Sequence, residues 1–159
     1  MTKALILAAG RGVRLRPYTD TIPKPLLPVG SHCLMDWQLA ALFKAGVTDV
    51  VINVAHLADA FATIPEKLKA RGFNAALSIE GPTHASALET LGGIAKALPL
   101  LTDGVEPFLV LAGDVVHAFD LKRLLLKRKA LMSGEIDAHL VVVPNPPFNP
   151  RGDMALDEK

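Results

Sequence analysis

Arginine and lysine side chains follow the first apolar run of the sequence at short spacings. Arg11, Arg14 and Arg16 come first, and Lys24 stands further along with a proline on each side. The two prolines are expected to restrict the lysine to an extended backbone, which presents its ammonium group at a low cost in chain entropy. A guanidinium group can fork onto two phosphate oxygens, whereas an ammonium group acts as a point charge. Either residue type alone is typical of a basic surface loop, but the combination favours phosphate binding.

Gly10 and Gly12 stand on either side of Arg11 and follow the strand-like residues 3–7. Without a Cβ atom, the chain can turn sharply there and direct several backbone N–H groups at a phosphate. A Rossmann fingerprint needs a third glycine where Leu15 stands, and a P-loop needs a Gly-Lys-Ser/Thr ending that is absent. A dinucleotide-dependent oxidoreductase is therefore disfavoured.

Two further places in the sequence could contribute to a site. Asp114 follows the apolar residues 107–112, so its carboxylate is expected at a sheet edge where ligands bind, although such an aspartate is also a common turn cap. Gly92 and Gly93 interrupt a helical pattern at a cost of about 1 kcal/mol each relative to alanine. Close approach to a ligand or to a neighbouring strand would explain them equally well.

The elements that must position these residues alternate along the chain. Strands are predicted at 3–7, 49–54, 75–79, 107–112 and 138–143, and helices at 34–45, 58–70 with a break, 90–98 and 120–132, the last with Asp120 as its N-cap. Continuous apolar strands indicate burial on both faces, as in a parallel sheet. We therefore predict an α/β fold with a doubly wound, mostly parallel sheet, helices on both faces, and ligands beyond the carboxyl ends of the strands.

Composition supports one folded domain. The chain has 159 residues, 50% of them hydrophobic and 21% charged, with a net charge of +1, so no global field favours nucleic acid. No run approaches the roughly 20 apolar residues that span a membrane. The single cysteine, Cys33, cannot form an intrachain disulfide, which fits a reducing cytoplasm. The proline-rich loop 144–150 is the best boundary, between a nucleotide-binding core at 1–145 and the start of a sugar-binding region at 146–159.

The residues between 7 and 29 form a long composite motif. Leu-Ala-Ala-Gly-x-Gly-x-Arg-Leu-x-Pro at 7–17, Thr19, and Pro-Lys-Pro-Leu-x-Pro-Val at 23–29 together resemble the signature of the nucleotide-sugar pyrophosphorylase superfamily. Its members have a Rossmann-like nucleotidyltransferase core and join a nucleoside triphosphate to a sugar 1-phosphate, releasing pyrophosphate. The resemblance implies catalytic roles for Arg14 and Lys24. It implies nucleotide contacts for Ala8, Ala9, Gly10, Arg11, Gly12, Val13, Arg14, Lys24, Glu89 and Gly92.

Two shorter stretches extend the resemblance. Residues 87–94 resemble the second glycine motif of the superfamily, which lies near the base and ribose, with Leu91 where alanine or glycine is common. The Gly-Asp-Val at 113–115 resembles its metal-binding motif, which implies Asp114 as a ligand of Mg²⁺, an ion that takes few protein ligands and shares phosphate oxygens. Ala112 stands where close relatives have an asparagine, so a hydrogen bond to the sugar is expected to be missing there.

Within the superfamily, residues 87–115 most resemble the uridylyltransferases that act on N-acetylmuramate 1-phosphate in peptidoglycan recycling. Residues 149–153 extend that resemblance, which implies Asp153 as a contact on the sugar side. The expected reaction is in-line attack of the sugar 1-phosphate on the α-phosphorus of UTP. Mannose-1-phosphate guanylyltransferases and thymidylyltransferases share the first motif and remain alternatives. So does a nucleotide-binding remnant or regulatory subunit without turnover, which Ala112 favours.

The resemblance also carries expectations about the end of the chain. Members of the superfamily continue further, and their additional part supplies a second metal carboxylate and much of the sugar pocket. The residues Asp157, Glu158 and Lys159 follow a possible strand, which suggests a shortened or split form. An exposed sheet edge in such a form would need cover from a partner chain or from a second copy in a homo-oligomer.

Overall fold

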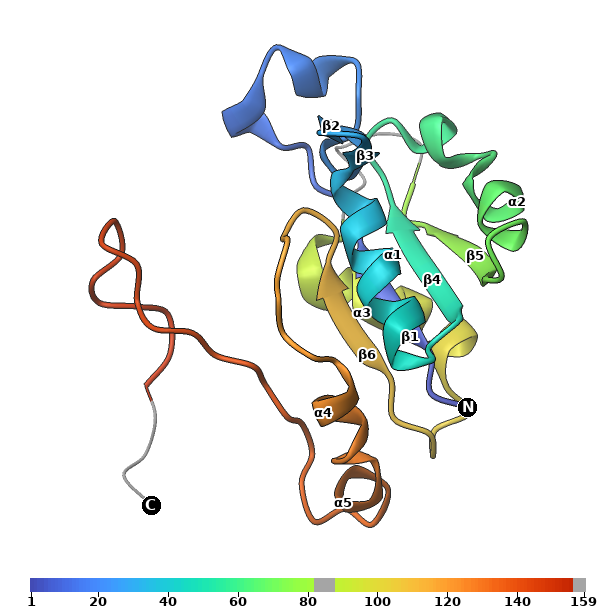
Figure 1. Cartoon of the computed structure of the whole chain (residues 1–159), viewed down its shortest axis with the longest axis vertical. Coiled ribbons are helices and arrows are strands. Elements are labelled where there is room, and N and C mark those ends of the chain that lie inside the picture. Colours follow the sequence, from blue (N-terminus) through green and yellow to red (C-terminus); the bar gives the residue numbers. More distant parts are fainter. Residues whose placement is uncertain (82–87, 156–159) are drawn as a thin grey trace.

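A parallel sheet forms the centre of the computed structural model, which describes residues 1–81 and 88–155. The four strands β1 (Ala4–Leu7), β4 (Asp49–Val54), β5 (Asn74–Ile79) and β6 (Leu109–Ala112) are arranged in the order β5-β4-β1-β6, and every neighbouring pair is parallel (Figure 1). The predicted parallel α/β architecture is therefore confirmed.

Helices cover both faces of the sheet, as predicted. Ala4 and Ile6 point to a core shared with α1 (Leu34–Ala45) and α2 (Ile64–Lys69). Leu5, which lies between them, points to the opposite face and packs with residues of α3 (Glu89–Leu101). This alternation follows from the two-residue period of a strand, which buries both faces when both are apolar.

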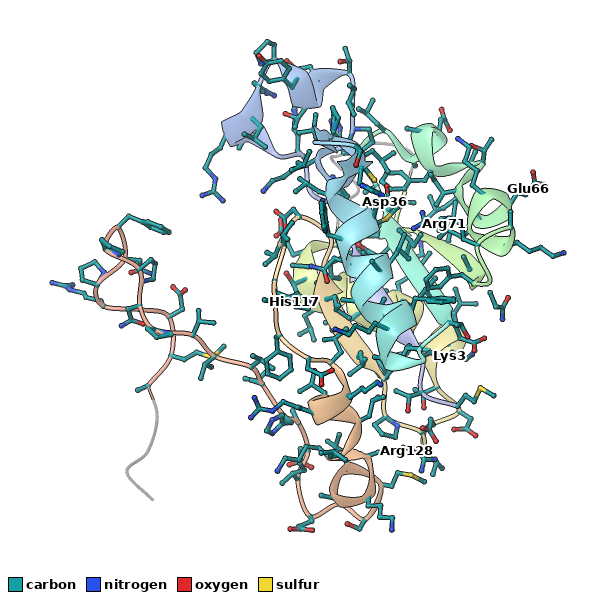
Figure 2. The ribbon with its side chains drawn as sticks, in the orientation of Figure 1. Lys3, Asp36, Glu66, Arg71, His117 and Arg128 are labelled. Carbon is teal, nitrogen blue, oxygen red and sulfur yellow. The ribbon has the colours of Figure 1, made fainter. Side chains whose placement is uncertain are left out.

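Helix α1 has the predicted bounds because both of its ends are defined locally. The carboxylate of Asp36 accepts a hydrogen bond of 3.1 Å from the backbone N–H of Cys33 at the first turn, and Gly46 ends the helix with φ of 80°. Asp36 also pairs with Arg71, at 2.5 Å, which ties α1 to the segment after α2 (Figure 2). Burial raises the pKa of Asp36, but the hydrogen bonds from Arg71 and Cys33 outweigh it, and the net pKa lies below its usual value.

The helix predicted at 120–132 is instead two short helices, α4 (Lys122–Leu125) and α5 (Arg128–Met132). The predicted cap is present, since the Asp120 carboxylate accepts a hydrogen bond of 3.1 Å from the backbone N–H of Lys122. The interruption arises where the N–H of Lys127 bonds the carbonyl of Leu124, at 2.9 Å, because this three-residue spacing tightens the turn and ends the regular helix.

The strand predicted at 138–143 is wrong for this structure. These residues form no strand and extend away from the sheet (Figure 1), with Val143 76% exposed. A strand needs a neighbour to pair its backbone N–H and C=O groups, and none of the described strands pairs with this segment. The outer edge of β6 is thus left without a pairing strand among the described residues.

Short elements shape the segment between β1 and α1. It contains the single-turn 3-10 helices η1 (Val13–Leu15), η2 (Tyr18–Asp20) and η3 (Lys24–Leu26), followed by a small antiparallel pair, β2 (Pro28–Val29) with β3 (His32–Cys33). A further 3-10 turn, η4 (Ala58–Phe61), precedes α2, so the break predicted within 58–70 is confirmed. In the part of the chain that is described, no helix has the length and apolar character needed to cross a bilayer.

Candidate active site

The strand order creates a crevice between β1 and β6. From β1 the chain proceeds through α1 to β4 and then to β5, and it returns through α3 on the opposite face to β6. The order of strands therefore reverses between β1 and β6, and α/β proteins bind ligands beyond the carboxyl ends of the strands at such a point. The loop after β1, drawn in blue in Figure 1, lies at the end of the molecule toward which β4 and β6 point.

A cavity of about 470 Å³ lies at this edge of the sheet. It brings together segments that are distant in sequence: the loop after β1, the end of β4, the residue after β5, the start of α3 and the end of β6. The residues singled out from the sequence that line it are Ala8, Ala9, Gly10, Arg11, Gly12, Val13, Arg14, Lys24, Glu89, Ala112 and Asp114.

Gly12 fixes the shape of the loop after β1. Its φ of +66° lies in the left-handed region that favours glycine, and an added Cβ would lie 3.0 Å from Cγ2 of Thr19 and 3.1 Å from Cβ of Lys24. The hydroxyl of Thr19, itself buried, donates a hydrogen bond of 3.0 Å to the carbonyl of Gly12. Close packing at this glycine therefore holds the loop against the lysine.

Lys24 does not have the extended backbone that its flanking prolines led us to expect. It begins η3, in which Leu26 N–H bonds the carbonyl of Pro23 at 2.9 Å. Pro25, which lacks an N–H group, occupies the middle of this turn without losing a hydrogen bond. The proline restriction still acts on the segment, but it stabilises a tight turn.

The cationic side chains around the cavity differ in how they are paired. Lys24 Nζ donates to the carboxylate of Asp114. Arg11 lies 4.0 Å from Asp20, and its Nε is buried without a hydrogen-bond partner. Arg14 has no ion pair or hydrogen bond from its side chain within the described residues. Guanidinium N–H groups that have no partner in the protein, together with backbone N–H groups, can bind an anion such as a phosphate.

Asp114 follows β6 and is positioned by contacts from α1. Gln38, buried within α1, donates from Nε2 to the carbonyl of Val115, and its Oε1 lies 3.1 Å from Nε2 of His117. Gly113, just before the aspartate, has no room for a side chain, since an added Cβ would lie 2.8 Å from the backbone oxygen of Leu7. The turn that carries the carboxylate is thus held between α1 and β1.

Sequence reasoning missed a polar wall of the cavity formed by Asn53 and Glu80. Asn53 Nδ2 donates to Oε1 of Glu80, and the backbone N–H of Leu88 donates to Oε2 of Glu80 at 2.6 Å. The two side chains are only 1% and 7% exposed. The sequence could have indicated this pair, because an asparagine lies within the apolar β4 run and a glutamate directly follows β5, both at carboxyl ends of strands. Thr90 also lines the cavity and was not predicted.

The paired glycines of α3 have different surroundings. A Cβ on Gly93 would lie 2.5 Å from Glu80 Oε1 and 2.6 Å from Asn53 Nδ2, so close approach to residues of the neighbouring strands explains this glycine. Gly92 is not among the residues that line the cavity, and a Cβ there would meet Cβ of Leu88 at 2.7 Å. Glu89, at the start of the helix, has φ of +57°, which is uncommon for a residue other than glycine.

The remaining residues singled out from the sequence lie outside the cavity or outside the described residues. Asp153 lies in the extended segment after α5, where its carboxylate accepts a hydrogen bond of 3.2 Å from Asn149, and it does not line the cavity. This segment runs away from the sheet (Figure 1). Ala87, the first residue of the second glycine motif, lies outside the described residues, as do Asp157, Glu158 and Lys159.

The donor set fits a cation that is shared with phosphates. No group of three or more His, Cys, Asp or Glu side chains gathers anywhere in residues 1–81 or 88–155 to hold a metal ion by itself. Mg²⁺, however, often takes only one or two carboxylates and completes its shell with water and phosphate oxygens. Asp114, which lines the same cavity as Arg11 and Arg14, offers such a carboxylate.

Comparison with known proteins agrees with this arrangement. The chain is 49% identical over 154 residues to the N-acetylmuramate alpha-1-phosphate uridylyltransferase of Neisseria meningitidis serogroup B, which covers 97% of this chain and 64% of that protein. It is 39% identical over 117 residues to mannose-1-phosphate guanyltransferase beta-B of Xenopus laevis, covering 74% of this chain and 32% of that protein. The solved structure of UDP-glucose pyrophosphorylase complexed with UDP-glucose matches with a TM-score of 0.60 and 27% identity, over 81% of this chain and 54% of that chain.

The chain therefore spans less than two thirds of these relatives. The Nucleotidyl transferase family matches residues 3–158, a range that contains every segment lining the cavity. This chain belongs to the nucleotidyl transferase family.

Proposed function

We propose that this chain binds UTP with Mg²⁺ and joins it to a sugar 1-phosphate, N-acetylmuramate 1-phosphate, to give a UDP-sugar and pyrophosphate. One observation carries the proposal. A single cavity gathers a glycine loop, the unsatisfied Nε of Arg11, the exposed Arg14, Lys24 and Asp114 at the point where the strand order reverses. These are the groups that a triphosphate with a divalent cation requires.

The chemistry asks for alignment and charge neutralisation more than for a nucleophilic side chain. In our proposal the backbone between Ala8 and Val13 shapes the triphosphate, and Arg14 forks onto its oxygens. Lys24 neutralises the charge that develops at the α-phosphorus while a sugar 1-phosphate oxygen attacks in line and pyrophosphate leaves. Mg²⁺ held by Asp114 and the phosphates would supply further neutralisation of charge.

In our proposal the base and ribose lie at the start of α3. Glu89 and Thr90 of this helix line the cavity, as do the buried Asn53 and Glu80, which bond each other. Gly92 lies about one turn further along α3. In our proposal it supports the base pocket, because the absence of a side chain at Gly92 allows the first turn of the helix to lie close to the base. Backbone and side-chain groups there would tell uracil from other bases by hydrogen bonds, which discriminate strongly when buried.

The sugar side of the proposed site is the least complete. Ala112 lines the cavity but has no side-chain group that could hydrogen-bond a sugar. Asp153 would contact the sugar only if the segment after α5 lay over the cavity. The high identity to a uridylyltransferase that acts on N-acetylmuramate 1-phosphate supports the choice of base and sugar. The weaker match to a mannose-1-phosphate guanyltransferase makes that activity the second candidate.

The proposed setting is peptidoglycan recycling in the cytoplasm, where a chain with a single cysteine needs no disulfide. We also propose that a second copy or a partner chain covers the open edge of β6. Exposed strand edges in native proteins are generally covered or blunted, because their free backbone groups invite pairing with other chains.

Pyrophosphate release tests the proposal. The 159-residue chain is incubated with Mg²⁺, UTP and N-acetylmuramate 1-phosphate, and then with UTP, GTP or dTTP against glucose 1-phosphate and mannose 1-phosphate. We expect release above the enzyme-free rate only with UTP and N-acetylmuramate 1-phosphate, and loss of that release in Lys24→Ala. Release that prefers GTP and mannose 1-phosphate would select the second candidate. UTP binding with no release in any mixture would identify a nucleotide-binding chain without turnover.

A further inference from the structure

The two charges that the proposed function assigns to the triphosphate and to the cation are paired with each other. Lys24 Nζ donates to the carboxylate of Asp114, and the two side chains are 25% and 34% exposed. Within the described residues, neither side chain has another hydrogen bond or ion pair. The carboxylate of Asp114 is therefore already paired with Lys24 when a cation arrives.

A cation alone or a triphosphate alone would have to break this ion pair, and each would supply a new partner for only one of the two side chains. A cation that binds Asp114 alone leaves the ammonium group of Lys24 without a partner and adjacent to a new positive charge. A triphosphate that takes Lys24 alone leaves the carboxylate of Asp114 unpaired and close to phosphate oxygens. Removing one partner from a partly buried ion pair has a cost that grows with burial, because the other charge stays without compensation.

A complex of a divalent cation with a triphosphate supplies both new partners together. We propose that the Lys24–Asp114 pair acts as a selectivity device, which opens by exchange of partners and admits the cation–triphosphate complex in preference to the free nucleotide or the free cation. This inference rests on the proposed function and adds to it the form of the nucleotide that the site accepts. Arg14 and Nε of Arg11, which are not occupied, make the first contacts.

The surroundings favour such an exchange of side chains on a fixed frame. The side chain of Lys24 projects from a tight turn in which Pro25 is buried. Cβ of Lys24 packs against Gly12. On one side of Asp114, Gly113 packs closely against β1. On the other side, the carbonyl of Val115 accepts a hydrogen bond from Gln38. Neither backbone has to move for the two side chains to separate, so the exchange requires only rotation about side-chain bonds.

Binding of Mn²⁺ alone, measured from the loss of its free electron paramagnetic resonance signal, tests the first half of the inference without any nucleotide. We expect Lys24→Met to bind Mn²⁺ at least about fivefold more tightly than the unchanged chain. Lys67→Met removes an equal charge from an exposed position on α2 and should leave the affinity unchanged. If Lys24→Met fails to fold by circular dichroism, Lys24→Gln replaces it. Equal affinities in the lysine variant and the unchanged chain, or no binding in either, would overturn the inference.

Binding of UTP in the presence of EDTA tests the second half. Asp114→Asn should raise the affinity for metal-free UTP in two ways, by removing a repulsive charge and by releasing Lys24. In the Lys24→Met background only the first effect remains, so the gain should be smaller by about fivefold or more. An equal gain in both backgrounds would refute the exchange. If the unchanged chain bound no UTP even with Mg²⁺, the proposed function would fail, while the Mn²⁺ measurement would still decide whether Lys24 blocks Asp114.

Discussion

Gly93→Ala is the substitution whose effect the structure defines most closely. The new Cβ would lie 2.5 Å from Glu80 Oε1 and 2.6 Å from Asn53 Nδ2, inside a buried network that also holds the N–H of Leu88. Either the helix shifts away from the sheet or the bond between the two side chains breaks. The first outcome costs about 1–3 kcal/mol for overpacking. The second costs a similar amount, about 1–3 kcal/mol, for a buried polar group left unsatisfied.

Helix propensity acts in the opposite direction. Alanine is better than glycine inside a helix by about 1 kcal/mol, so the expected net loss of unfolding free energy is about 0–2 kcal/mol. For a chain of this size that loss lowers Tm by up to about 8 °C. Urea unfolding followed by the fluorescence of Trp37, the only tryptophan, measures it.

Two controls isolate the steric effect. Ala95→Gly, at an exposed position of α3, reports the helix propensity of the same helix and should cost about 1 kcal/mol. In a Glu80→Ala background the carboxylate is gone, so alanine at 93 should cost less than it does in the unchanged chain. A Gly93→Ala variant more stable than the unchanged protein by about 1 kcal/mol, the full gain in helix propensity, would refute the close packing that we infer.

The remaining predictions concern the loop, the cationic residues and a distant ion pair. Arg14→Ala and Lys24→Ala should each weaken binding of UTP with Mg²⁺ by about 10- to 100-fold in calorimetry, since a hydrogen bond to a charged group contributes about 1.5–3 kcal/mol. Gly12→Ala should lower the free energy of unfolding by about 1–2 kcal/mol, because φ is +66° there, and should weaken UTP binding as well. Arg128 of α5 donates to both carboxylate oxygens of Glu106, at 2.5 and 2.6 Å. This pairing lowers the pKa of Glu106 from 4.5 to about 2, so the stabilisation is present above pH 4.5 and is lost as the pH falls toward 2. Urea unfolding at several pH values should show a weaker loss of stability over this range in Glu106→Gln, and an identical pH dependence would contradict the pairing.

The central fold could be predicted because its signal is local. Apolar runs indicated β1 and β4, and Gly46 marked the end of α1, where only a residue tolerant of positive φ fits well. The site residues after β1 and β6 could be located for a related reason. In a parallel sheet all carboxyl ends meet at one edge, so polar residues after different strands are brought together.

Other features depended on contacts that a single sequence does not reveal. The strand predicted at 138–143 has the right residue types, but a strand exists only with a partner, and its apolar side chains remain exposed. The buried bond between Asn53 and Glu80 joins residues 27 positions apart, and the pair of Lys24 and Asp114 joins residues 90 apart. Their positions at the sheet edge were predictable in part, whereas their pairing required the three-dimensional structure.

Thermal unfolding with and without UTP and Mg²⁺ tests the central claim most directly. If the cavity between β1 and β6 holds the triphosphate, UTP at 100 times its Kd should stabilise the unchanged chain by about 2.7 kcal/mol and raise Tm by about 5–10 °C. Lys24→Ala at the same ligand concentration should show a much smaller rise. An unchanged Tm with UTP, GTP and dTTP alike, or an equal rise in Lys24→Ala, would contradict the claim that this cavity is a nucleotide site.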